Sequence, residues 1–81
     1  MPNPSAVIPT WTEIRATQEY QLDSAYVFNI LVGSLGTSVY SQQTAFLQLI
    51  TEVIAINRYF NRHLADFKDV DRTPFFQHLA A

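Results

Sequence analysis

The chain has 81 residues, no cysteine and a formal net charge of −2, and 48% of its residues are hydrophobic. This length allows one domain with a small core, because a chain of this size hides only about 60% of its surface on folding. The acidic balance argues against a nucleic-acid partner, and the lack of cysteine excludes disulfides and thiolate metal sites and fits a cytoplasmic location. We expect surplus apolar surface that a protein partner or a second copy covers.

The N-terminal part combines a proline-rich stretch with a clear helix start. Residues 1–9 hold three of the four prolines and predict an extended arm before a single helical domain over residues 10–81. Thr10 and Glu13 form a capping-box pattern, and apolar residues then recur at steps of three and four, which predicts a helix over about residues 12–32.

Within that first helix, the segment Ala25–Val32 is rich in aromatic and β-branched residues and suits a strand by propensity. We favour a helix because no second strand signal is present to pair with it; a strand is the alternative.

Residues 33–36 contain two glycines and predict a turn, after which a long second helix is predicted over about residues 38–67. Its apolar residues alternate four and three apart, as in a heptad seam. We expect Thr51, Arg58 and Arg62 to face away from this seam. The seam residues are Val39, Gln43, Phe46, Ile50, Val53, Asn57, Phe60, Leu64 and Phe67.

Asn57 is the informative polar residue of the seam. A buried Asn between helices costs stability but can fix their register by pairing with its counterpart. The alternative is that Asn57 bonds a neighbouring side chain or water.

The C-terminal part begins with a charged break at residues 68–72, and Thr73-Pro74 then predicts a short helix over about residues 74–80. Phe75, Phe76 and Leu79 give this helix an apolar side. Two readings carry equal weight: the segment docks into a groove of a partner, or it caps the open end of the helical bundle.

The segment from Ser24 to Thr51 has no charged side chain, which raises the question of a membrane span. Two glycines, several Ser and Thr residues, Asn29 and three glutamines interrupt its apolar character. A spanning helix needs about 20 predominantly apolar residues, so the sequence predicts none.

Catalytic and cofactor signals are absent from the pattern of residues. His63 lies one turn from Asp66, but a metal site needs three or four ligands, and we interpret His63 as a surface histidine. Glu19 is placed to pair with Arg15 on the first helix. No phosphate loop and no nucleophile–base pair is present, so we predict no catalytic residue, cofactor or metal, and a protein that is not an enzyme.

Part of the chain resembles a known family. Tyr20-Gln21-Leu22 precedes Asn29-Ile30-Leu31, and Val39-Tyr40 opens the long second helix. Over residues 15–64 this order resembles the last helical pair of outer-membrane efflux channel proteins. Asp23 stands where that family favours glycine, and the turn residues differ. The resemblance implies a helical fragment or subunit of a larger assembly.

Together these patterns predict an all-α fold: an antiparallel helical hairpin with a long second helix and a short C-terminal helix, two copies of which dimerise into a four-helix bundle. The function we expect is a non-enzymatic interaction or assembly protein, such as an adaptor, a regulator or a chaperone-like subunit. A third reading is a small-ligand carrier or small enzyme whose inter-helix pocket uses Tyr40, Tyr59 and His63. The candidate interface residues are Phe46, Ile50, Val53, Asn57, Phe60, Leu64, Phe75, Phe76 and Leu79.

Overall fold

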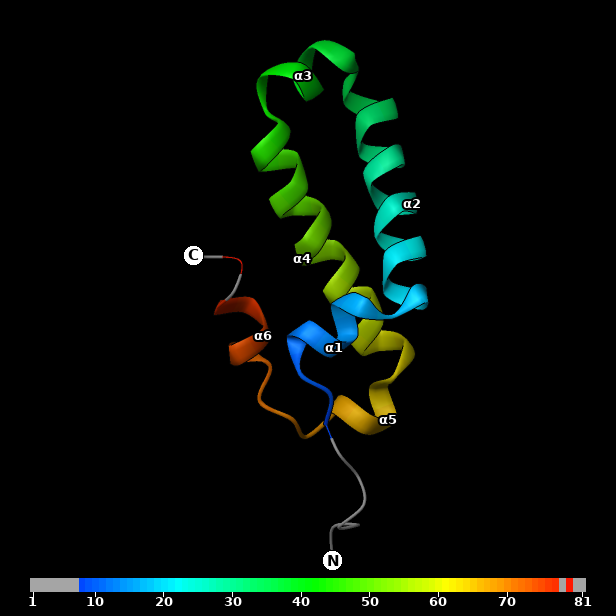
Figure 1. The fold of residues 1–81 in the computed structure, drawn as a ribbon, viewed down its shortest axis with the longest axis vertical. Helices are drawn as coiled ribbons and strands as arrows, with labels where there is room; N and C mark the ends of the chain where they lie inside the picture. The colour runs from blue at the N-terminus through cyan, green and yellow to red at the C-terminus, as the bar shows by residue number, and fades with distance from the viewer. Residues whose placement is uncertain (1–7, 78, 80–81) are drawn as a thin grey trace, which may run out of the picture.

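The computed structural model describes residues 8–77 and residue 79, and over these residues the chain is helical with no strand (Figure 1). Most of the predicted arm and part of the predicted C-terminal helix lie outside the described residues. The helices, in chain order, are α1 (Trp11–Ala16), α2 (Gln18–Leu35), α3 (Thr37–Gln42), α4 (Thr44–Arg62), α5 (Leu64–Phe67) and α6 (Thr73–Gln77).

The predicted antiparallel hairpin is formed by α2 and α4, which run side by side in opposite directions (Figure 1). The short helix α3 crosses between them at one end, which we call the tip. The helices α1, α5 and α6 gather at the other end, which we call the base.

The predicted first helix is two helices, because the chain breaks at Thr17. The capping box is present: the Glu13 amide donates to the Thr10 hydroxyl at 3.2 Å, and the Thr10 amide donates to the Glu13 carboxylate at 3.1 Å. Thr17 has an extended backbone, with φ −70° and ψ 146°, and its hydroxyl accepts the Tyr20 amide at 3.1 Å. A single helix over residues 12–32 is therefore wrong, since Thr17 ends α1 and caps α2.

Residues 25–32 lie inside α2, so the helix is confirmed over the strand. The helix ends at Gly36, whose φ of 90° is readily accessible only to glycine. The predicted turn at residues 33–36 thus begins later than expected, since Gly33 still belongs to α2.

The predicted second helix is three helices, α3, α4 and α5, with breaks at Gln43 and His63. Both residues leave helical geometry, with φ and ψ of −128° and 34° at Gln43 and −114° and 36° at His63. The second break turns the chain so that the Phe67 ring lies 4.9 Å from the Phe60 ring. In a continuous helix, Phe67 would lie farther along the axis, away from the base. Because the helix breaks at His63, the predicted seam does not continue to Phe67.

The core lies at the base rather than along the hairpin. Phe60 is at its centre, and the rings of Phe75 and Phe76 lie 5.2 Å and 6.0 Å from it. The helix α6 therefore folds back onto the base. The buried residues of this cluster are Trp11, Ile14, Tyr20, Ala55, Ile56, Tyr59, Phe60, Phe67 and Phe75.

The side of α4 that faces α2 is not the predicted seam. Leu47, Thr51 and Ala55 are buried and lie four residues apart on one side of α4. Arg58 and Arg62 continue the same side and reach α2. The expectation that Thr51 and the two arginines face away is wrong, because Leu47, two small side chains and the ion pairs line this contact. The Thr51 hydroxyl is satisfied within α4 by the Leu47 carbonyl at 2.7 Å.

Candidate functional site

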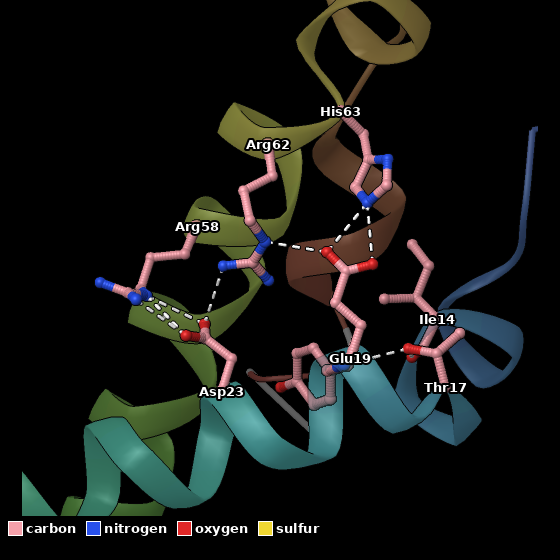
Figure 2. Close-up of polar contacts among 8 residues, drawn as sticks. Ile14, Thr17, Glu19, Asp23, Arg58, Arg62 and His63 are labelled. Atoms are coloured by element: carbon pink, nitrogen blue, oxygen red, sulfur yellow. Dashed lines mark hydrogen bonds and ion pairs between the residues drawn. The ribbon is translucent and has the colours of Figure 1, made fainter.

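Charged side chains connect α2 to α4 near the base (Figure 2). The Arg58 guanidinium donates to both oxygens of Asp23, from Nε at 3.0 and 2.9 Å and from Nη2 at 2.8 Å. The Asp23 side chain keeps only 11% of its exposure. The Arg58 hydrogen bonds lower the pKa of Asp23, so this carboxylate stays charged well into the acidic range.

A second set of contacts lies next to the first and is centred on Glu19. Arg62 donates from Nε to Glu19 Oε2 at 2.8 Å, and His63 Nε2 lies 2.9 Å from the same oxygen. Arg62 also reaches Asp23 Oδ2 at 3.3 Å, which joins the two sets (Figure 2). The hydrogen bond from Arg62 lowers the pKa of Glu19. The predicted pairing of Glu19 with Arg15 is wrong, because the break at Thr17 separates the helices that carry them.

All charged residues of the sequence lie outside residues 24–51, so the tip half of the hairpin is neutral. This half and the neighbouring turns of α2 and α4 expose large apolar side chains. On α2, Leu22, Tyr26 and Ile30 are 64%, 56% and 49% exposed at four-residue steps. On α4, Phe46 is 56% exposed, and Ile50 and Val53 continue its row half-buried.

These two rows lie on the same side of the hairpin. Residues two apart on a helix point in nearly opposite directions, about 200° around the axis. A cavity between α2 and α4 is lined by residues that lie two positions along the chain from each residue of the two rows. The rows and the cavity are therefore on opposite sides of the hairpin. We call this apolar surface the hairpin face; it consists of Leu22, Tyr26, Ile30, Phe46, Ile50 and Val53.

The Arg58 side chain borders this face at its base end. Its guanidinium carbon lies 5.7 Å from the centre of the Tyr26 ring, a cation–π contact. Arg58 thus holds Asp23 on one side and Tyr26 on the other, and marks the boundary between the charged base and the neutral tip.

The predicted interface residues form two groups, the hairpin face and the base, and three single residues, Asn57, Leu64 and Leu79. Phe46, Ile50 and Val53 belong to the hairpin face. Asn57 lies exposed one turn beyond Val53, with its side-chain amide donating to the Val53 carbonyl at 2.9 Å. Leu64 is exposed on α5. Phe60, Phe75 and Phe76 contribute to the base, the first two buried and Phe76 half-buried. Leu79 is half-buried and lines a hollow with residues of α1 and α4.

The α2 half of the hairpin face was missed by sequence reasoning. Leu22, Tyr26 and Ile30 are spaced by four, which is a signal for one side of a helix. The alternating series read along α2 instead passed through Leu22 toward Ala25 and Phe28. The exposed row and the buried residues Tyr20 and Val27 differ by which side of α2 meets α4, and the sequence does not state that.

The cavity on the opposite side of the hairpin has a volume of about 490 Å³. It is open to solvent and combines apolar with polar walls. Tyr40, Tyr59 and His63, the residues expected for an inter-helix pocket, do not line it. Its lining residues are Arg15, Tyr20, Gln21, Ser24, Ala25, Phe28, Gln48, Thr51 and Glu52.

Within the described part of the chain, no three His, Asp or Glu side chains gather closely enough to hold a metal ion. Over the same residues, no helix is long and apolar enough to cross a lipid bilayer. Comparison of the chain with protein-family models, curated proteins and solved structures found no match.

Proposed function

We propose that this chain is a non-enzymatic assembly protein that pairs with a second copy through the hairpin face. The observation that carries the proposal is the neutral, apolar surface along α2 and α4, with Leu22, Tyr26 and Phe46 each more than half exposed. Contiguous apolar surface of this kind is typical of sites where proteins associate. Two hairpins placed face to face form a four-helix bundle, as the surplus of apolar residues in the sequence predicts.

A second copy is favoured as the partner because of the charge distribution. In a two-fold interface the same patch meets itself, so any net charge on it would meet an equal charge. The six residues of the hairpin face are uncharged and Arg58 lies only at its border, so this repulsion is weak. A neutral face also offers nothing to steer a charged partner, since steering requires complementary potentials.

The experiment compares the mass of the assembled protein in variants that place a charge on either side of the hairpin. The wild type should sediment at twice 9.3 kDa at micromolar concentration. Ile30→Glu and Phe46→Glu should each give a helical monomer, because a buried unpaired carboxylate strongly disfavours the interface. Gln48→Glu adds the same charge to α4 on the opposite side and should remain a dimer.

Two results would count against this proposal. A wild type that stays a folded monomer over the whole concentration range removes the second copy as the partner. A wild type that is molten alone and gains fixed structure only with a different protein favours the alternative, a helical subunit of a larger complex, which the likeness to efflux-channel helices also suggests.

A further inference from the structure

A residue that lines the cavity opposite the hairpin face carries a buried hydroxyl group without a partner. Tyr20 lines this cavity and is only 3% exposed, with its ring edge-on to Trp11 at 5.4 Å between centroids. Its hydroxyl forms no hydrogen bond with any described residue. A buried hydroxyl without a hydrogen bond is unfavourable, so this position is suited to a group that arrives from outside the chain.

The hydroxyl is a neutral donor at physiological pH. Burial raises the pKa of Tyr20 to about 12, and the negative charge of Glu52 acts in the same direction. A phenol in this state donates its proton to an acceptor such as a carboxylate or carbonyl oxygen. A matching ligand therefore presents an oxygen acceptor to Tyr20.

Two charged side chains line the same cavity, one of each sign. Arg15 extends from α1 and Glu52 from α4. Neither forms an ion pair with the described residues, whereas Arg58 and Arg62 are both engaged in the cluster at the base. Phe28 and Ala25 supply an apolar wall from α2. The cavity thus combines a cation, an anion and an apolar surface, next to the buried neutral donor of Tyr20.

We propose that this cavity binds a small zwitterion with an apolar side chain, the chemistry of a free aromatic or aliphatic α-amino acid. Its carboxylate pairs with Arg15 and accepts from the Tyr20 hydroxyl, its ammonium group pairs with Glu52, and its side chain lies on Phe28. The cavity volume of about 490 Å³ is within the usual range for small-molecule sites. This function goes beyond self-assembly and uses the other side of the hairpin, so either can fail without the other.

The binding test uses the fluorescence of Trp11, the single tryptophan of the chain, which contacts Tyr20 directly. The full chain is titrated with L-phenylalanine, with phenylalaninamide, which lacks the carboxylate, and with 3-phenylpropanoate, which lacks the ammonium group. Phenylalanine should give a saturable change. Each analogue should bind at least about tenfold more weakly than phenylalanine, because it has lost one charged hydrogen-bonding group.

Variants assign each charge to its group. Arg15→Gln should weaken the binding of phenylalanine by at least about tenfold. In this variant phenylalanine should bind no more tightly than phenylalaninamide. In Glu52→Gln, phenylalanine should bind no more tightly than 3-phenylpropanoate. No saturation with phenylalanine, or equal binding of all three compounds by the wild type, would overturn the proposal.

The variant Tyr20→Phe tests whether the Tyr20 hydroxyl binds the ligand or is already satisfied by a water molecule. Removing an unpaired buried hydroxyl should keep or raise the melting temperature of the ligand-free protein and weaken phenylalanine binding. A lower melting temperature with unchanged binding would show that the hydroxyl serves the fold alone and would overturn its role. Tyr26→Phe, on the hairpin face, is the matched control and should leave phenylalanine binding unchanged.

Discussion

At Thr17 one side chain both ends α1 and begins α2. Its hydroxyl donates to the Ile14 carbonyl at 2.7 Å and accepts from the Tyr20 amide at 3.1 Å. Thr17→Ala should lower the free energy of unfolding by about 1 kcal/mol, the usual effect of losing an N-cap. Urea unfolding followed by circular dichroism measures this. Thr12→Ala, an exposed change within α1, is the control; an equal loss there would contradict a capping role.

The contrast between Thr10 and Thr17 shows how far single residues could be predicted. Thr10 was identified because Glu13 completes a reciprocal motif just after a proline-rich stretch. Thr17 has an acidic residue two positions later but lies within a continuous apolar period, and that period predicts a single helix. The signal was present, and the stronger periodic pattern outweighed it.

At the scale of elements, the contacts between Asp23 and Arg58 and between Glu19 and Arg62 hold α2 against α4. Both carboxyl groups have a pKa below their ordinary values of 3.8 and 4.5, so the unfolded chain takes up protons first as the pH falls. Their stabilisation is complete above those ordinary values and is lost on further acidification. We expect the melting temperature to fall below about pH 5.

Two variants test whether this acid dependence comes from the cluster. Asp23→Asn should be less stable than the wild type at neutral pH and should lose less on acidification. Asp66→Asn changes an exposed carboxylate on α5 and should keep the full dependence. If Asp23→Asn keeps the wild-type profile, the cluster does not hold the two helices together.

The helix α6 depends on Phe75 for its place at the base. Phe75 is buried against Phe60 and Phe67. Phe75→Ala should lower the free energy of unfolding by about 3–5 kcal/mol, enough to unfold much of a marginal domain. Leu64→Ala, an exposed change on α5, is the control for urea unfolding. A loss below 1 kcal/mol for Phe75→Ala would mean that α6 is held weakly.

The sides of α4 show why the elements were easier to predict than their contacts. Periodicity identified a long helical segment with a broad apolar stripe. It could not tell that Arg58 would meet Asp23, 35 residues earlier, and thereby turn Phe46 and Ile50 outward. Long-range pairing decides which of two apolar sides is buried, and a single sequence does not contain that information.

At the scale of the whole molecule, charge and apolar surface are separated along the hairpin. Because the hairpin face is mostly neutral, we expect the proposed dimer to persist as salt is raised, since only charge interactions are screened. The contacts at the base should weaken over the same range. Sedimentation and thermal unfolding at low and high salt measure the two effects; dissociation of the dimer by salt would contradict the proposed interface.

The general architecture could be predicted from the sequence: helical content, a hairpin and a short helix after a charged break. The base could not, because its core joins residues from both ends of the chain. Trp11 and Phe75 enter the same cluster although no local pattern links them. The cavity was likewise anticipated in kind and not in its lining, since Tyr20 and Glu52 meet only after α2 and α4 have paired.

The position of the core also sets when the fold can close during synthesis. Its cluster joins Trp11 to Phe75, so it cannot be complete until Phe75 has been made and has left the ribosome. A nascent chain that still lacks Phe75 carries Phe60 without one of its ring contacts, so the base closes late, after the residues of both long helices have been made.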